Sequence, residues 1–454
     1  MKSIVPALIG VCLSFSLYAT HLIGGEIAFR QIDPLTVEAE GYLYHSSGGR
    51  DSITLCWGDG NCDRVVRSNG PDIDGDGIPD GEPVPGTSAT LSIYKHTHTY
   101  EAKGAYILSI TEPNRNGGIL NLNFPNSDQV RFHVQSLVNV TNDNTPNHSP
   151  VNYEPMAVDN AMESRLFQHT PNAFDQDGDS IAYHLVAPNQ DIDTELPNYE
   201  DQLAAVSLDP ITGVFNFQSD QPGEYVFAIQ VRTYRNDTLQ DVVVRDMLIF
   251  CSPGALLPPI LSLSQLATER EVLVGDTVII DAAALSEPFG EPLQLTCTGG
   301  LLEYFGNPAT FDSLPAAPLA EATFQWVVEP EDFRDAPYQI VFKARDDGNI
   351  FGLSTLIPVR FRVVEALTST DVFNGRTDWK LFPNPATGSL QISRSEYSGP
   401  VGYEIRAASG QLLLSGRLQQ SGNRVDISSL PKGWYVLSVL LPDGQQRPLP
   451  FIKQ

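Results

Sequence analysis

The segment Gly223-Glu224-Tyr225-Val226-Phe227-Ala228-Ile229-Gln230-Val231 shows the pattern that decides the fold class. Large apolar residues occupy every second position, so an extended strand places them all on one face. These residues are Tyr225, Phe227, Ile229 and Val231. Similar short runs recur along the chain between clusters of Gly, Pro, Asn and Asp, and no long window shows the period of a helix. The pattern predicts an all-β protein built from tandem β-sandwich domains.

Length and charge limit the classes of protein that the chain can form. At 454 residues the chain is too long for one hydrophobic core, so several domains are expected. The net charge of −27 argues against nucleic acid and anionic membrane as partners, because phosphate contacts need clustered Lys and Arg. An acidic surface is typical of extracellular, calcium-loaded proteins, although a need for solubility would explain the same charge.

The N-terminus has the features of a secretory signal peptide over residues 1–20. A positively charged start is followed by an apolar run at 4–17 and small residues at 19–20. The run is too short for a membrane span, and no later segment is apolar enough, so we expect no transmembrane span in the mature chain. Cys12 raises the alternative of a lipoprotein, but the residues before it match the usual lipobox poorly.

Four cysteines remain after the signal peptide: Cys56, Cys62, Cys251 and Cys297. An even number in an exported chain permits two disulfides. Cys56 and Cys62 are close enough in sequence to staple one loop, and we predict that pair. A disulfide between Cys251 and Cys297 would join two adjacent domains and stays an open alternative. Neither pair has the C-x-x-C spacing of a redox or zinc site.

Residues 21–140 contain two motifs in order, Leu55-Cys56-Trp57-Gly58-Asp59-Gly60 and His98-Thr99-Tyr100-Glu101-Ala102-Lys103-Gly104-Ala105-Tyr106. Together they resemble the signatures of PKD domains, an Ig-like sandwich common in surface proteins. The first motif lacks the two residues that the family has between its Trp and its Gly. The opening His21-Leu22-Ile23-Gly24-Gly25-Glu26-Ile27 also resembles the mature start of gliding-motility-associated surface proteins of the Bacteroidota. These resemblances imply a PKD-like sandwich with the two tyrosines of the second motif in its core.

Residues 141–252 contain a D-x-D-G-D turn at 175–179, then Asp209-Pro210-Ile211-Thr212-Gly213-Val214-Phe215, then the strand quoted first. The three motifs in this order resemble cadherin-like (dystroglycan-type) Ig domains. Residues 253–365 look like a fainter copy without the acidic turn, so we predict a third Ig-like domain there. The expected architecture is therefore a series of Ig-like β-sandwiches.

The last segment, 379–454, follows a polar stretch at 366–378 that we interpret as a linker. It opens with Leu381-Phe382-Pro383-Asn384-Pro385-Ala386-Thr387-Gly388 and continues through Leu430-Pro431-Lys432-Gly433-Trp434-Tyr435 to Phe451-Ile452-Lys453-Gln454. This order resembles the C-terminal sorting domain of the type IX secretion system of the Bacteroidota. The resemblance implies export to the cell surface or the medium, with the secretion machinery as a partner. The residues of the sorting motif are Pro383, Asn384, Pro385 and Gly388.

The best candidate metal site is Asp72-Ile73-Asp74-Gly75-Asp76-Gly77-Ile78-Pro79-Asp80-Gly81-Glu82. Carboxylates at positions 1, 3, 5 and 9 with Gly at position 6 match the start of an EF-hand or thrombospondin type 3 calcium loop. Position 12 is Pro83, which lowers the expected affinity or moves the last ligand elsewhere. We predict Ca²⁺ here, and the alternative is a solvated acidic turn. The predicted ligands are Asp72, Asp74, Asp76, Asp80 and Glu82.

Two further clusters have weaker patterns. Asp175, Asp177 and Asp179 are predicted as a second calcium site, and the alternative is that they hydrogen bond their own turn. His96 and His98 could face one way on a strand and bind a transition metal. However, His98 falls on the PKD-like signature and no third ligand is evident, so we predict no metal there.

Catalytic signatures for zinc proteases, serine hydrolases, P-loops and dinucleotide sites do not occur in the sequence. We therefore predict a non-enzymatic structural or adhesin-like surface protein, with attachment or gliding as candidate roles. Surface glycans or other surface proteins are the candidate partners. One rival is a secreted hydrolase whose catalytic residues follow no familiar pattern. The other is a carbohydrate-binding protein that uses Trp57 and Trp326 as a platform, although such residues more often belong to the core.

Overall fold

The computed structural model describes residues 22–45, 49–84, 89–122, 125–142, 147–154, 160–196, 199, 204–265, 269–286, 292–303, 308–346, 352–364, 379–394, 401–407, 411–418, 424–440 and 446–454. The predicted signal peptide at 1–20, with Cys12, and the predicted linker at 366–378 lie outside these residues. The chain divides into two compact units, Met1–Val364 and Glu365–Gln454. We describe each unit by itself.

Strands of the first two predicted domains hydrogen bond in one sheet, which has 14 strands among the described residues. The main path through it runs β4-β3-β7-β8-β19-β1-β2-β6-β5. The strands are β1 (Leu22–Asp33), β2 (Thr36–His45), β3 (Ser52–Cys56), β4 (Cys62–Val66), β5 (Glu82–Pro83), β6 (Thr90–Thr99), β7 (Gly104–Glu112), β8 (Phe132–Val140), β10 (Ala161–Met162), β13 (Ser180–Val186), β14 (Asn189–Asp191), β15 (Thr194–Glu195), β18 (Gly223–Arg235) and β19 (Thr238–Ser252).

The sheet folds over a first core, whose buried residues lie between Leu22 and Val140. Strands β1, β2 and β6 cover one side of this core and β3, β7 and β8 cover the other. Alternation decides the inward face: in β2, Val37 and Ala39 are buried while Glu38 and Glu40 between them are partly exposed. A short 3₁₀ turn, Ser127–Gln129, precedes β8.

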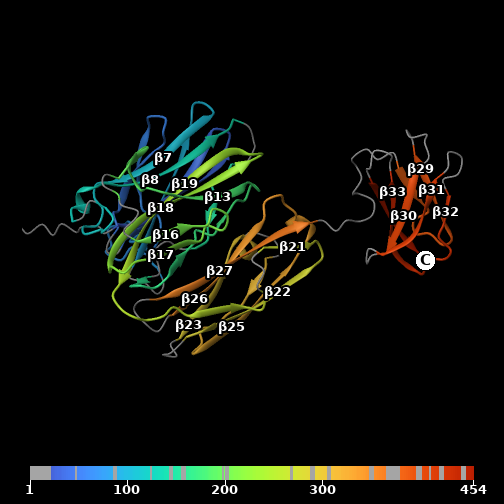
Figure 1. Cartoon of the computed structure of the whole chain (residues 1–454). Coiled ribbons are helices and arrows are strands. Elements are labelled where there is room, and N and C mark those ends of the chain that lie inside the picture. Colours follow the sequence, from blue (N-terminus) through green and yellow to red (C-terminus); the bar gives the residue numbers. More distant parts are fainter. Residues whose placement is uncertain are drawn as a thin grey trace, which may run out of the picture. The chain divides into compact units, whose positions relative to one another are not determined.

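Strand β19 connects this sandwich to the next one. One edge of β19 pairs along most of its length with β18. Its other edge is shared, because Val242 and Val243 pair with β8 while Asp246 and Met247 pair with β1. Figure 1 shows β18 and β19 side by side. The predicted boundary at residues 140 and 141 therefore lies within one hydrogen-bonded sheet.

The second core lies between β18 with β19 and a small sheet in the order β11-β17-β16. The alternating segment 223–231 forms the first part of β18. Its residues Tyr225, Phe227 and Ile229 are fully buried in this core. The remaining strands of this region are β9 (Val151–Asn152), β11 (Phe167–His169), β12 (Ala173–Phe174), β16 (Ala205–Leu208) and β17 (Phe215–Gln218).

The third predicted domain is a sandwich of two four-stranded sheets, ordered β20-β22-β25-β24 and β21-β27-β26-β23 (Figure 1). Trp326, Tyr338 and Phe361 meet in its core. Its elements are β20 (Ile260–Leu263), β21 (Glu269–Leu273), β22 (Thr277–Leu285), β23 (Leu293–Thr298), α1 (Gly300–Glu303), β24 (Thr310–Phe311), β25 (Leu319–Val327), a 3₁₀ turn (Pro330–Asp332), β26 (Tyr338–Asp346) and β27 (Ser354–Val364).

The C-terminal unit is a smaller sandwich of one sheet ordered β28-β29-β32 and another ordered β31-β30-β33-β34. Its core joins both sheets through residues such as Ile392, Ile405, Leu437 and Phe451. The strands are β28 (Trp379–Phe382), β29 (Ser389–Arg394), β30 (Val401–Ala407), β31 (Leu412–Leu418), β32 (Arg424–Asp426), β33 (Gly433–Leu440) and β34 (Gln446–Lys453). The prediction of an all-β protein with Ig-like sandwiches is confirmed.

Candidate functional site

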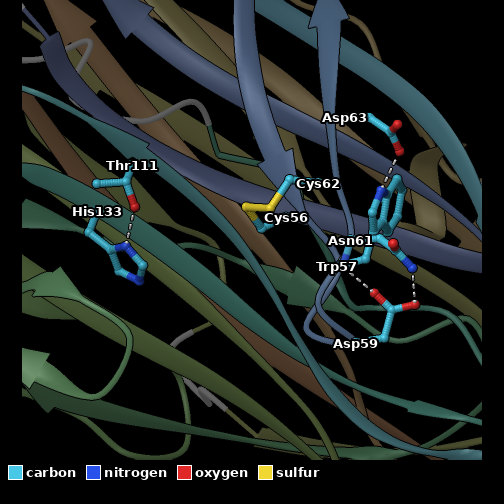
Figure 2. The surroundings of a disulfide bond; sticks show 8 residues. All are labelled: Cys56, Trp57, Asp59, Asn61, Cys62, Asp63, Thr111 and His133. Atoms are coloured by element: carbon cyan, nitrogen blue, oxygen red, sulfur yellow. Dashed lines mark hydrogen bonds between the residues drawn. A yellow bond between two sulfur atoms is a disulfide. The ribbon is translucent and has the colours of Figure 1, made fainter.

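The two PKD-like motifs meet in one buried cluster around Trp57, which is fully buried. Its indole Nε1 donates to Asp63 at 2.8 Å, as Figure 2 shows, and the His98 ring stacks on it with centroids 4.9 Å apart. The hydroxyl of Tyr100 donates to the carbonyl of Trp57 at 3.0 Å, and Tyr100 stacks on Tyr106. The cluster therefore holds the fold together, and Trp57 is not available as a sugar-stacking platform. Trp326, buried in the third sandwich, is equally inaccessible.

The cysteines pair as predicted at one position. Cys56 and Cys62 lie opposite each other at the end of the β3–β4 hairpin and form a disulfide (Figure 2). Cys251 and Cys297 are free thiols, so the alternative disulfide between them is absent from the structure. Burial raises the pKa of Cys251 to about 11 and raises that of Cys297 well above its ordinary value. Both thiols therefore stay protonated at neutral pH.

His96 and His98 take part in hydrogen-bonded or charged pairs with different carboxylates. His98 Nε2 lies 2.7 Å from Asp59 Oδ2, and His96 Nε2 lies 3.7 Å from Asp63 Oδ2. The Asp59 carboxylate also accepts the backbone N–H of Asn61 at 2.9 Å. These contacts give both imidazoles protein partners.

The predicted calcium loop brings three of its five carboxylates together. One carboxylate oxygen from each of Asp72, Asp74 and Asp80 lies within 4.8 Å of the others. Asp76 and Glu82 do not belong to this group. These three are positions 1, 3 and 9 of the calcium motif, and all three side chains are at least partly exposed. Carboxylate oxygens at this spacing are ligands that Ca²⁺ accepts.

Backbone N–H groups turn inward around the same loop. Asp72 accepts hydrogen bonds from Gly75 and from Gly77, at 2.8 and 3.0 Å. Asp80 Oδ2 accepts the N–H of Ile73 at 2.7 Å. Gly77 has a φ of +89°, a left-handed conformation that a side chain would strain, which explains why this position is Gly. The loop is thus closed by its own carboxylates.

Arg67 is almost fully buried and contacts the acidic loop at Pro79 and Asp80. Its guanidinium donates to the carbonyl of Pro79 through Nε and lies 3.4 Å from both Asp80 Oδ1 and Asp51 Oδ1. This contact orients Asp80 and supplies one compensating positive charge on the protein side of the loop. Hydrogen bonds and the contact with Arg67 therefore hold the acidic loop in place, while one face of the loop stays exposed to solvent.

The second acidic turn has a different environment. Asp179 forms a two-point ion pair with Arg235, at 2.7 and 3.0 Å, and Asp177 pairs with His148 Nδ1 at 2.8 Å. Asp175 is fully buried, and it accepts the N–H of Asp179 at 2.9 Å. Burial raises the pKa of Asp175 to about 6. Asp175 thus hydrogen bonds within its own turn, while Asp177 and Asp179 pair with His148 and Arg235, which lie outside it.

A buried network of charges joins the three predicted domains of the first unit. Arg245 on β19 forms a two-point ion pair with Glu26 on β1, at 2.8 and 2.9 Å, and donates to the carbonyl of Glu154 at 2.9 Å. The Glu154 carboxylate accepts from Thr298 at 2.6 Å and lies 3.3 Å from Lys343. The pairing of these charged residues was not predicted from the sequence. The available signal was a charged pair inside the otherwise apolar run of β19.

The sorting motif forms hydrogen bonds with the last strand of the C-terminal unit. Asn384 accepts the N–H of Ile452 at 2.9 Å and donates to the carbonyl of Pro450 at 3.2 Å. Next to it, Ala386 exchanges backbone hydrogen bonds with Ile452 and Gln454, at 2.8 and 2.9 Å. The carbonyl of Gly388 accepts the N–H of Ile427 at 3.0 Å. The two ends of the predicted sorting domain therefore contact each other directly.

Comparison with known proteins identifies the C-terminal unit. Residues 380–446 match the family described as the secretion system C-terminal sorting domain. This tail indicates export by type IX secretion, so the fold and the tail together define a secreted or outer-surface β-sandwich protein. No curated protein matches the sequence. Among the described residues, no helix is both long and apolar enough to cross a membrane.

Several solved structures show some likeness to this chain. Titin domains A168–A170 are 14% identical over 66% of this chain and 98% of that chain, with a TM-score of 0.20. Latent PorU from Porphyromonas gingivalis is 16% identical over 66% of this chain and 32% of that one, with a TM-score of 0.15. Drosophila N-cadherin EC1-3 is 15% identical over 70% and 90%, with a TM-score of 0.18. TM-scores this low do not support a structural relationship. The fold class therefore rests on the strands and cores described above.

Proposed function

We propose that residues 22–364 form a non-enzymatic adhesive or structural module that the C-terminal sorting domain delivers to the cell exterior. The observation that carries the proposal is the compact β unit attached to a secretion tail. Buried Arg245 and Glu154 tie together strands from all three predicted domains, which suits a module that resists mechanical load. Attachment to surfaces and a contribution to gliding are the roles we favour, and an origin in the Bacteroidota accords with both.

The test of this role compares the wild-type strain with a strain that lacks the gene. Loss of attachment or of spreading, restored by the full chain, supports the proposal. The rival hydrolase makes the opposite prediction: the purified full-length protein would turn over members of a polysaccharide or peptide library. Turnover by the wild-type protein together with unchanged attachment in the deletion strain would refute the proposed role.

We further propose that the loop from Asp72 to Glu82 binds Ca²⁺ and stabilises the first sandwich. The support is the convergence of Asp72, Asp74 and Asp80 on one exposed point. Extracellular calcium modules bind with Kd values of roughly 10⁻⁴ to 10⁻³ M. At that affinity, about 10 mM Ca²⁺ stabilises the folded state by roughly 1.4 to 2.7 kcal/mol.

Calorimetric titration and thermal melting of chelator-treated protein test the calcium site. We expect Ca²⁺ to raise the Tm of the wild-type protein, and we expect Asp72→Asn or Asp80→Asn to remove at least half of that rise. Asp76→Asn should have a smaller effect, because Asp76 lies outside the converging group. Glu101→Gln, in a different exposed turn, is the matched control. Equal calcium responses in all four variants would refute the calcium site and show that the loop is a solvated acidic turn.

A further inference from the structure

A cavity of about 300 Å³ opens over the outer face of β1, β2 and β6. Its walls come from these three strands, from the stretch at 148–151 and from Gln176 in the acidic turn at 175–179. Cross-strand pairing places Arg30 beside Glu38 and Glu40 beside Lys95 on this face. The residues that line the cavity include Ala28, Arg30, Glu38, Lys95, His148 and Gln176.

The charged groups in the cavity already neutralise one another. Glu38 Oε1 lies 2.6 Å from the Arg30 guanidinium and 2.8 Å from Lys95 Nζ, and Lys95 also contacts Glu40 at 2.8 Å. Two cations and two carboxylates leave no net charge. An ionic ligand would have to displace one of these pairs, so the cavity favours an uncharged polar ligand.

Hydrogen-bonding capacity remains after these pairs are formed. Among the residues that the structure describes, the hydrogen bonds and ion pairs of Glu38 use Oε1 alone, Lys95 pairs with two carboxylates, and the Gln176 side-chain amide has no hydrogen-bond partner. His148 uses Nδ1 for Asp177 at 2.8 Å, which leaves Nε2 for another partner. The cavity therefore offers both hydrogen-bond donors and acceptors, while Ala28, Tyr42 and Val151 supply apolar surface.

We propose that this cavity binds a short saccharide of one or two rings. A sugar hydroxyl both donates and accepts, so it can use the unpaired acceptor of Glu38 and the unpaired donor of Lys95 without breaking their ion pairs. The apolar wall suits the C–H face of a pyranose ring. The volume of about 300 Å³ lies at the lower end of the roughly 300–1,000 Å³ typical of ligand pockets, which suits a short ligand. The inference rests on the proposed adhesive role and names its ligand class.

The first experiment screens the full chain on an array of mono- to tetrasaccharides and measures the positive sugars, as methyl glycosides, by ligand-observed NMR. We expect at least one sugar to bind. Ala28→Trp, which fills the cavity and leaves every charge in place, should weaken that binding at least tenfold. Glu38→Gln, which removes the shared carboxylate, should do the same. Glu321→Gln, an exposed residue on the outer face of β25, is the matched control and should bind like wild type.

Circular dichroism and thermal melting confirm that each variant is folded before its binding is compared. The proposal is overturned if the wild-type protein binds no sugar on the array, or if folded Ala28→Trp binds as well as wild type. Attachment assays with the same variants separate the two proposals. Attachment that persists in Ala28→Trp would overturn the assignment of this site to adhesion and leave the adhesive role in place.

Discussion

At the residue scale, Asp241 on β19 is a fully buried carboxylate that faces amide donors instead of a cation. Its Oδ1 accepts hydrogen bonds from the N–H of Asn139 at 3.2 Å and from Asn147 Nδ2 at 3.1 Å. Burial raises the pKa of Asp241 to about 7, although both hydrogen bonds favour the ionised form. The folded protein therefore binds a proton there in a pH range where the unfolded chain does not.

This shift predicts a pH-dependent effect of Asp241→Asn. A raised folded-state pKa adds stability that is fully present below about pH 4, the unfolded-state value, and is lost as the pH rises to about 7. Asparagine mimics the protonated acid, so the variant should gain stability relative to wild type by a few kcal/mol between about pH 4 and 8. Urea unfolding at several pH values measures this difference. A difference that does not change with pH would show that Asp241 does not titrate in this range.

Residues outside a motif decide what the motif does. The pentapeptide D-x-D-G-D occurs twice, at 72–76 and at 175–179. The carboxylates of the second copy face His148 and Arg235, two residues that are remote in sequence. In the first copy, Asp72 and Asp74 converge with Asp80 on the exposed side of the loop. The same local pattern therefore yields a candidate cation site in one place and an internally neutralised turn in the other.

At the element scale, hairpin ends and strand ends are held by specific links. The β3–β4 hairpin closes with the disulfide between Cys56 and Cys62, beside the buried Trp57. In the C-terminal unit, the turn after β28 holds the end of β34 through Asn384. Both links join segments at the surface, where strands otherwise fray.

Replacing both hairpin cysteines, as Cys56→Ser with Cys62→Ser, should destabilise the first sandwich. Closing so short a loop removes entropy from the unfolded chain worth roughly 2 kcal/mol. Chemical denaturation of the double variant against wild type measures the loss. Treating the wild-type protein with a reductant provides the control, because it should produce the same change without substitution. No difference between the double variant and wild type would refute a stabilising role.

Asn384→Ala should loosen the last strand. The substitution removes the acceptor for the N–H of Ile452 and the donor to the carbonyl of Pro450. Loss of a typical hydrogen bond costs about 1 kcal/mol, so amide exchange in Gln446–Lys453 should speed up about tenfold. Hydrogen exchange followed by mass spectrometry on the full chain measures this rate. Gln391→Ala, an exposed position on β29, is the control and should leave the rate unchanged.

At the scale of the whole molecule, the first unit is held together by strand sharing and by buried charge. Strand β19 belongs to the sheets of two sandwiches, and Arg245 on it reaches Glu26 in one predicted domain and Glu154 beside another. These links make the first unit a single compact body and not a string of independent beads.

Breaking the central ion pair should be costly. Arg245→Met leaves Glu26 buried without its charged partner, which typically costs about 3–5 kcal/mol. The double variant Glu26→Gln with Arg245→Met should recover a large part of this loss, because it no longer buries an unpaired charge. Denaturant unfolding of the wild-type, single and double variants gives the coupling energy. Purely additive effects would contradict the ion-pair interpretation.

Much of the fold and part of the candidate site could be predicted from the sequence. Alternation in 223–231 predicts a strand because the period of a β-strand is local. The pairing of Cys56 with Cys62 was also predictable, since a short separation restricts the choice of partners. The pairing of β19 with β1 was not predictable, because hydrogen bonds between strands so far apart leave no trace in either segment. For the same reason, the contribution of Lys95 and His148 to one cavity appears only in the folded chain.

The sequence by itself determined the strands, the hairpin disulfide, the acidic loop and the secretion tail. Each of these depends on residues that are near one another along the chain, where periodicity, turn chemistry and motif spacing act. The tertiary structure alone decided that two predicted domains share a sheet and that one of the two D-x-D-G-D turns pairs with His148 and Arg235. These features depend on contacts between distant segments, whose partners are selected only when the cores pack.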